Sequence, residues 1–298
     1  MQDFARILVA LAHQASDGDL IRYSALLAQI WPKARFDWVH VRPAGSPAPA
    51  GPGLTLEALE THVGSFLGEG LARTSRFYVL DGEPVDRLLE FSARHRTDLV
   101  LMGHGRSSSR RRSLARRMAM NAPCSVWLAP EGAHLTLSRI LVPVDLSARS
   151  ADALAMACSL AAAAGIEELT ALHVYFNEAA ATYDEYEETL LENNEDAFYR
   201  FVARIDLRGA DVKPIFVESP EIARTILRVA GEQKFDLIVM GTRGRSRSAS
   251  IMLGSETEHA IVETRVPLLA VKHFGARLPL VRALLDRRFQ RRGGERFT

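Results

Sequence analysis

Three glycines and a serine with a regular spacing lie in the second half of the chain: Gly241, Gly244, Gly254 and Ser255. Their segment, VMGTRGRSRSASIMLGSETEH at 239–259, starts as an apolar strand and ends as the start of a helix. Glycine lets a ligand approach the backbone closely, and the unpaired N–H groups of a helix N-terminus stabilise an anion. The segment therefore predicts an anion site. The loop also contains cationic side chains that would suit a polyphosphate: Arg243, Arg245 and Arg247.

A parallel sheet is needed to position this site, because ligands of open α/β sheets bind at the carboxyl ends of strands, where the strand order reverses. Apolar runs without polar alternation indicate strands buried on both faces. These runs are RILVPV (139–144), ELTALHV (168–174), VKPIFV (212–217), DLIVMG (236–241) and PLLAVK (267–272). Helix signals separate the runs: Ser147 and Gly165 bound one helix, and Ser219 and Pro220 start another.

The chain contains this pattern twice, since four segments match in the same order. They are 5–13 with 138–146, 36–43 with 169–176, 97–105 with 235–243 and, after a gap, 122–129 with 265–272. Two tandem doubly wound α/β domains are therefore expected, separated by APEGAHLTLS at 129–138, a sequence typical of a linker. We place the domains at 1–133 and 134–275, followed by a basic amphipathic tail at 276–298.

The spacing G-x2-G-x9-G-[ST], together with ILVPVD at 140–145 and LHV at 172–174, resembles the ATP-binding signature of the universal stress protein family. The resemblance covers nearly all of 138–272 and, more loosely, 4–129. It implies a five-stranded parallel sheet of order 3-2-1-4-5 in each domain. It also implies that the last strands pair the two domains as an intramolecular pseudo-dimer, or pair subunits in a homodimer.

The same resemblance implies ATP as the ligand of the second domain. The Asp145 carboxylate could hold a metal ion such as Mg²⁺ together with the phosphates, which leaves slow hydrolysis open. Asp145 and Val174 would face the adenosine, and Ser255 and Thr257 would close on the phosphates with Gly254. The full set of expected binding residues is Pro143, Val144, Asp145, Val174, Met240, Gly241, Arg243, Gly244, Gly254, Ser255 and Thr257.

The first domain lacks this signature and is expected to bind no ATP in the manner of the family. Ala12 stands where the second copy has Asp145, and no glycine–serine pair follows Gly103 and Gly105. The loop from Gly103 to the matching proline is also six residues shorter than its counterpart.

Several residues allow a structural interpretation beside the functional one. Ser255 with Glu258 matches a capping box, in which the serine starts the helix without any ligand. Glu256 departs from the small apolar residue usual in the family, and a carboxylate there would compete with phosphate unless it turned away. His40 and His173 each follow an apolar strand and are expected to anchor a loop by hydrogen bonding; no metal site is predicted. The two cysteines, Cys124 and Cys158, are expected to be packed thiols.

Two basic segments have open interpretations. The first contains Arg106, Arg110, Arg111, Arg112, Arg116 and Arg117. It is either a solvated surface or a site for an anionic ligand or a partner, with the acidic segment 177–198 as a candidate complement. The tail at 276–298 is expected to pack on its own chain, with nucleic acid or membrane binding as the less favoured alternative.

Charge, composition and the motifs present narrow the kinds of protein that the sequence allows. A net charge of +1 gives the whole chain no reason to seek nucleic acid, and the longest apolar stretch, at 153–165, is too short to span a membrane. With two cysteines and no signal-peptide pattern, the chain is expected to be cytoplasmic. We expect an ATP-binding regulatory protein of the stress response that is at most a weak ATPase, since no enzyme motif accompanies the glycines. The alternatives are a slow ATPase and a protein-interaction module that binds no nucleotide.

Overall fold

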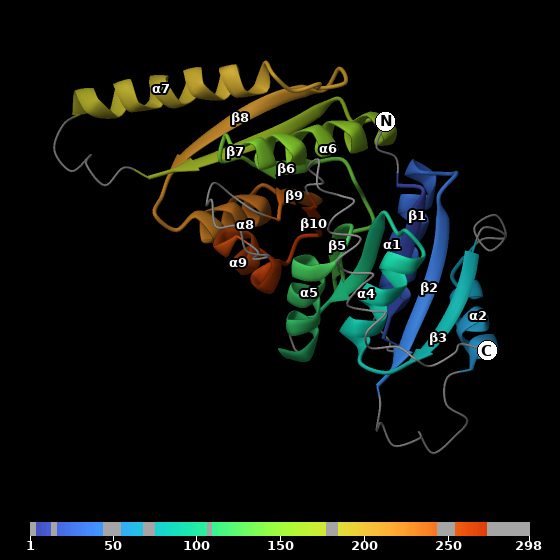
Figure 1. The fold of residues 1–298 in the computed structure, drawn as a ribbon. Coiled ribbons are helices and arrows are strands. Elements are labelled where there is room, and N and C mark those ends of the chain that lie inside the picture. The colour runs from blue at the N-terminus through green and yellow to red at the C-terminus, as the bar shows by residue number, and fades with distance from the viewer. Residues whose placement is uncertain are drawn as a thin grey trace. The chain divides into compact units, whose positions relative to one another are not determined.

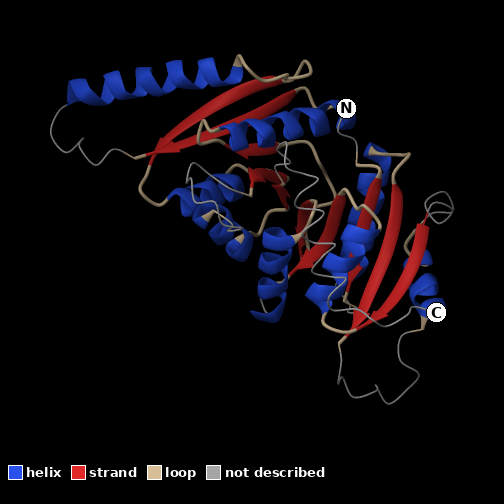
Figure 2. Cartoon of the chain, viewed as in Figure 1, coloured by secondary structure: helices blue, strands red, loops and turns tan. Residues whose placement is uncertain are grey.

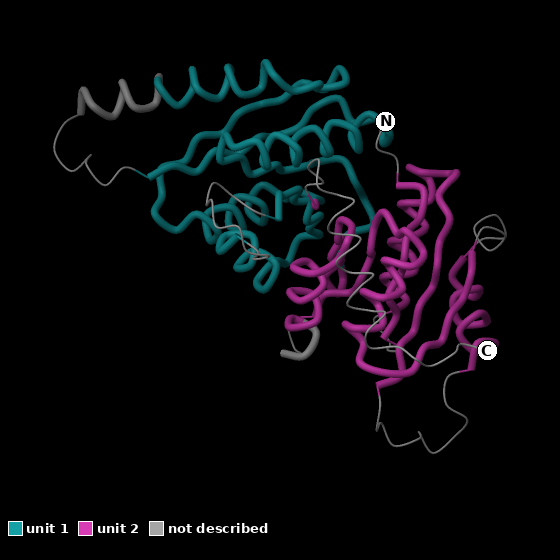
Figure 3. The backbone as a smooth tube through the Cα atoms, viewed as in Figure 1, with its two compact units in different colours: residues 1–3, 133–271 teal, residues 4–132, 272–298 magenta. Residues whose placement is uncertain are grey.

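A computed structural model describes residues 4–12, 17–43, 55–67, 75–105, 109–176, 184–242 and 254–272, without the side chains of 109–111 and 184–192. The described chain forms two compact units (Figure 3). One comprises residues 4–132 together with Lys272, and the other comprises residues 133–271.

Strands and helices alternate along both units (Figure 1). The first unit contains β1 (Arg6–Leu11), α1 (Asp17–Ile30), β2 (Arg35–Arg42), α2 (Leu56–Gly64), β3 (Ser75–Asp81), α4 (Pro84–Arg94), β4 (Leu99–His104), α5 (Ser109–Asn121) and β5 (Ser125–Pro130). The second contains β6 (Ile140–Pro143), α6 (Ala148–Ala164), β7 (Glu168–Tyr175), α7 (Asp184–Val202), β8 (Asp211–Glu218), α8 (Ile222–Glu232), β9 (Leu237–Gly241), α9 (Ser255–Glu263) and β10 (Leu268–Val271).

Each unit has a sheet of strands with helices beside it (Figure 2), and the two sheets have the same strand order. The order is β3-β2-β1-β4-β5 in the first unit and β8-β7-β6-β9-β10 in the second. Neighbouring strands pair in parallel throughout these two series. The predicted doubly wound α/β fold with order 3-2-1-4-5 is thus confirmed, and β6 lies between β7 and β9. The pairing of the two units through their last strands stays a prediction.

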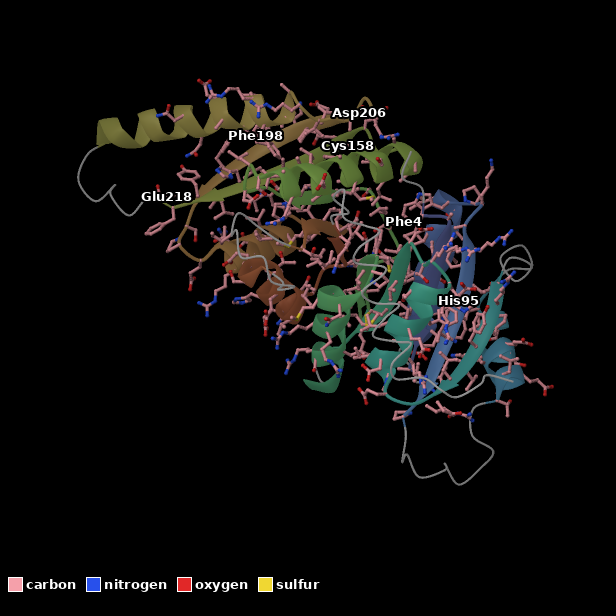
Figure 4. The ribbon with its side chains drawn as sticks, in the orientation of Figure 1. Phe4, His95, Cys158, Phe198, Asp206 and Glu218 are labelled. Atoms are coloured by element: carbon pink, nitrogen blue, oxygen red, sulfur yellow. The ribbon has the colours of Figure 1, made fainter. Side chains whose placement is uncertain are left out.

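The central strands are buried because helices pack against the sheet. All four residues of β6 are buried, as are the first four of β9, whereas the edge strand β8 has only exposed and half-buried positions. Phe198 lies on α7 (Figure 4). Its ring packs edge-on against that of Phe216 on β8, with 5.7 Å between the ring centroids, and so holds α7 against the sheet. This layering explains why the strand runs lack polar alternation in the sequence.

The duplication is also visible in hydrogen bonds that recur at matching positions. The Asp98 carboxylate accepts the N–H groups of Ala5 and Arg6 just before and at the start of β1, at 3.1 and 2.9 Å. In the second unit Asp236 accepts the N–H groups of Ser138 and Arg139 at 2.8 and 3.0 Å. In both units, the aspartate before the fourth strand therefore fixes the start of the first.

Both cysteines are free and buried, as the sequence predicted, and Cys158 lies on α6 (Figure 4). Burial raises the pKa of Cys124 to about 12 and the pKa of Cys158 to about 11. Among the described residues, no helix is long and apolar enough to cross a lipid bilayer.

Candidate functional site

The carboxyl ends of two neighbouring strands, β6 and β9, form the candidate site in the second unit. Strand β6 ends at Pro143 and is followed by Val144 and Asp145, while β9 ends at Gly241. The chain leaves β6 for β7 on one side and returns to β9 on the other, so the strand order reverses between β6 and β9. Asp145 and Gly241 therefore follow the two strands that flank the reversal, where ligands of doubly wound sheets bind.

A tight turn fixes Asp145 after β6. Its Oδ1 atom accepts the N–H of Ser147 at 3.1 Å, and Leu146 between them has a φ of 61°, in the left-handed region. Ser147 then caps α6, because its hydroxyl accepts the N–H of Ser150 at 3.3 Å. The start of α6 is thus occupied by the chain's own side chain.

A buried histidine holds the end of β6 from the neighbouring strand. The Nδ1 atom of His173 lies 2.8 Å from the carbonyl oxygen of Val144, and that of His40 lies 3.0 Å from the carbonyl oxygen of Leu11 in the first unit. A carbonyl oxygen only accepts, so Nδ1 is protonated in both histidines. The prediction that these histidines anchor a loop is confirmed, and His173 steadies the backbone that presents Asp145.

The first turn of α9 is tied to the end of β9 by two hydrogen bonds. The hydroxyl of Thr257, which is 5% exposed, donates to the carbonyl oxygen of Gly241 at 2.8 Å. The N–H of Gly254 donates to the carbonyl oxygen of Thr242 at 3.0 Å. Residues 241 and 254 are thus brought together although 12 residues separate them in the sequence.

The capping box expected at Ser255 is absent, and that prediction is wrong. Helix α9 begins at Ser255 with Gly254 as its N-cap, and the N–H of Glu258 donates to the Gly254 carbonyl oxygen at 2.8 Å. Gly254 has a φ of −65° and a ψ of 143°, which any residue can adopt, so the backbone does not require glycine here. Because glycine has no side chain, the N-cap offers no side-chain acceptor to the first turn of α9.

Glu256 turns toward a neighbouring helix, which the sequence did not indicate. Its Oε2 atom accepts the N–H of Ala223, in the first turn of α8, at 2.9 Å. Its Oε1 atom lies 3.3 Å from the hydroxyl oxygen of Ser255, which donates to it. The carboxylate therefore accepts hydrogen bonds from α8 and from Ser255, and does not turn to solvent.

Nine of the eleven expected binding residues lie in the described part of the chain, and Arg243 and Gly244 lie outside it. Val144, Val174 and Met240 are buried and supply apolar surface at the strand ends. Asp145 is half-buried and Ser255 is exposed, so both polar groups are open to solvent. Among the described residues, no group of three or more His, Cys, Asp or Glu side chains could hold a metal ion by itself.

The matching region of the first unit is built from other residues. The N–H of Ala12, which follows β1, donates to the carboxylate of Asp17 at 3.3 Å, and Asp17 is only 4% exposed. Strand β4 ends at His104, which is 1% exposed. The strand ends of the first unit thus carry different polar groups from those of the second, and the expectation that the first domain does not bind ATP stays a prediction.

The basic and acidic segments are only partly described. Arg117 forms an ion pair with Glu83 at 3.5 Å, as expected for a solvated surface. Arg106, the tail at 276–298 and residues 177–183 of the acidic segment lie outside the described residues, as do the side chains of Arg110 and Arg111. A hollow of about 510 Å³ lies at the amino-terminal edge of the second sheet, lined partly by Arg139, Gly165 and Phe235. It is at the opposite end of the strands from Asp145.

Comparison with known proteins identifies the family. The model of the universal stress protein family matches residues 3–130 and again residues 136–272. A universal stress protein from Thermus aquaticus is 44% identical over 50 residues, which are 17% of this chain and 36% of that protein. A universal stress protein from Methanocaldococcus jannaschii is 31% identical over 94 residues, 32% of this chain and 55% of that one. The chain thus spans only about a third to a half of the length of these curated relatives.

One solved structure, a Pseudomonas aeruginosa protein described as functionally unknown, matches with a TM-score of 0.72. It covers 96% of this chain and 98% of its own at 16% identity, which supports the fold alone. Since the family model matches twice and accounts for both units, the chain belongs to the universal stress protein family and contains two of its domains in tandem.

Proposed function

We propose that the chain binds one ATP molecule in its second domain, residues 134–275, and acts as a regulatory protein of the stress response. The observation that supports this best is the join between the two ends of the glycine motif. The Thr257 hydroxyl donates to the Gly241 carbonyl oxygen at 2.8 Å, so the start of α9, whose glycine N-cap has no side chain, lies at the end of β9, next to the reversal of strand order. A phosphate at this point would meet the N–H groups of the first turn of α9, which have no partner within the helix, and the positive end of the helix dipole.

Each part of the nucleotide has a matching surface in this proposal. Val174 and Met240 are apolar and would contact the adenosine, with Pro143 and Val144 beneath it. The Asp145 carboxylate would accept hydrogen bonds from the adenosine. The first turn of α9 would hold the phosphates, and Arg243 and Gly244 of the loop would complete that part of the site.

We further propose that the bound nucleotide is a signal and not a substrate. Hydrolysis requires a group that activates water near the terminal phosphate, and Asp145 is the only acid among the proposed binding residues. Its Oδ1 atom already accepts the N–H of Ser147. The two free, buried thiols suit the reducing cytoplasm, where ATP is abundant. In this proposal the partners are the nucleotide and the other domain of the chain, or a second copy of it.

A matched pair of glycine variants tests the proposal, because Gly241 and Gly103 occupy the same position in the two domains. Calorimetric titration of the full chain with ATP, with and without Mg²⁺, should give one site. Gly241→Val should abolish binding by filling the space that the nucleotide needs. Gly103→Val should not affect binding, and a Cβ at Gly103 meets no atom within 4 Å, so this variant should fold.

Two results would overturn the proposal. One is a parent protein that binds no ATP, which would favour the interaction module. The other is equal loss of binding in both glycine variants. Turnover of ATP by the parent protein, lost in Gly241→Val, would instead identify a slow ATPase.

A further inference from the structure

The carboxylate of Glu256 connects the proposed phosphate site to a second helix. Glu256 follows Ser255 in the first turn of α9 and is half-buried. One oxygen, Oε2, accepts the N–H of Ala223 on α8 at 2.9 Å, and the other, Oε1, accepts the hydroxyl of Ser255 at 3.3 Å. The Glu256 side chain thus accepts hydrogen bonds from the first residue of its own helix, α9, and from the second residue of α8.

On the α8 side, Glu256 supplies a cap that α8 lacks in its own sequence. The N-cap residue of α8, Glu221, makes no side-chain cap hydrogen bond and pairs with Arg224 instead. Ala223 is the second residue of the helix, so its N–H has no partner within α8. The carboxylate of Glu256 satisfies this donor and lies at the positive end of the α8 dipole, which stabilises its charge.

On the α9 side, the same carboxylate engages the hydroxyl group of Ser255. A serine hydroxyl has one proton, so a hydroxyl that donates to Glu256 cannot at the same time donate to a phosphate oxygen. At 3.3 Å the bond is long for an O–H donor, so it is the weaker of the two contacts that the carboxylate makes. The α8 cap, at 2.9 Å, is the stronger of the two contacts and keeps the carboxylate in place.

We infer that Glu256 is a positioning residue that withholds the Ser255 hydroxyl from the phosphates and thereby lowers the affinity of the second domain for ATP. This inference rests on the proposed function. The backbone donors at the start of α9 still bind the phosphates, but the site has one donor fewer than the sequence of the motif provides. In this inference the affinity for ATP depends on Glu256, and the position of Glu256 depends on its hydrogen bond to α8.

Four proteins test this inference: the full chain, Ser255→Ala, Glu256→Gln and the double variant. In Glu256→Gln the amide oxygen can still accept the N–H of Ala223, while the amide NH₂ group donates where Oε1 accepted. The Ser255 hydroxyl proton is then free for a phosphate. Glu256→Gln should bind ATP about three- to tenfold more tightly by calorimetry, the range expected for one recovered hydrogen bond.

The double variant separates the effect of the Ser255 hydroxyl on ATP affinity from the effect of removing the Glu256 charge. Ser255→Ala should cost more affinity in the Glu256→Gln background than in the parent, by about the same three- to tenfold factor. Hydrogen exchange of the Ala223 amide provides the structural control. Exchange should stay slow in Glu256→Gln and become faster in Glu256→Ala, which removes the acceptor.

The outcomes distinguish this inference from the proposed function. If the parent binds ATP and Ser255→Ala costs the same factor in both backgrounds, the hydroxyl was never withheld and the inference is wrong. Weaker binding in Glu256→Gln with slow Ala223 exchange would also overturn it. A parent that binds no ATP overturns the proposed function. If Glu256→Gln then binds ATP, that gain supports the inference about Glu256. If none of the four proteins binds ATP, both the proposed function and the inference are overturned.

Discussion

Replacing Asp236 with alanine should destabilise the second domain more than Asp98→Ala destabilises the first. The Asp236 carboxylate accepts the N–H and hydroxyl of Ser138, each at 2.8 Å, the N–H of Arg139 at 3.0 Å and the hydroxyl of Thr136 at 3.1 Å. These are four hydrogen bonds to one charged group. At the matching position of the first unit, Asp98 accepts the two backbone N–H groups that precede and begin β1.

The expected loss of unfolding free energy follows from the number of hydrogen bonds that each carboxylate accepts and from their exposure to solvent. A hydrogen bond to a charged group contributes roughly 1.5–3 kcal/mol, but solvent reaches both carboxylates, so we take about 0.5–1 kcal/mol for each bond. Asp236→Ala should then cost about 2–4 kcal/mol, and Asp98→Ala, with two bonds, about 1–2 kcal/mol. The difference is large enough to resolve in urea unfolding curves.

The tryptophans make the assay domain-specific, because all three lie in the first unit: Trp31, Trp38 and Trp127. Tryptophan fluorescence should therefore report the loss of stability of the first domain in Asp98→Ala. Circular dichroism, which reports on both domains, should report the loss of stability of the second domain in Asp236→Ala. A cost for Asp98→Ala equal to or above that for Asp236→Ala would refute the reasoning, since it would mean that the extra hydroxyl bonds contribute nothing.

The same carboxylate should make stability depend on pH. Burial acts to raise the pKa of Asp236, but the hydrogen bonds from Ser138, Arg139 and Thr136 outweigh it, so the pKa lies below its usual value. A group with a lowered pKa stabilises the fold fully above its unfolded pKa of about 3.9, and this contribution is lost as the pH falls through the folded pKa. The penalty of Asp236→Ala should therefore shrink below about pH 4. A penalty of the same size at pH 7 and at pH 2 would contradict this.

Two further predictions concern buried groups. Thr257→Val keeps the shape of the side chain but leaves the Gly241 carbonyl without its hydroxyl donor. We expect the free energy of unfolding in urea to fall by about 1–2 kcal/mol and ATP binding, measured by calorimetry, to weaken. Unchanged values of both would contradict the role given to this hydrogen bond. Cys124 and Cys158 should not react with a disulfide reagent at pH 8, because burial raises their pKa values to about 12 and about 11. Both should react once the chain is unfolded in guanidinium, and a fast-reacting thiol in the native protein would show that burial does not protect it.

The sequence predicted the features that depend on local patterns and on the repeat. Apolar runs located the five strands of the second sheet, and the repeat located four strands of the first but not β3. The recurrence of a histidine near the end of the second strand of each copy predicted the anchors at His40 and His173. The helix start at Ser255 was misplaced by one residue because Ser255 and Glu258 have the spacing of a capping box, while the structure uses Gly254. The contact of Glu256 with Ala223 joins residues 33 positions apart, and only the packing of α9 against α8 reveals it.

Hydrogen exchange of the full chain with and without ATP tests the central claim most directly, because it locates the ligand. The account predicts that ATP slows exchange in the segments around 239–242 and 254–258, and that the matching segment of the first domain, 101–105, exchanges at an unchanged rate. Equal protection of both domains, or protection of the first alone, would contradict a single nucleotide site between the ends of β6 and β9.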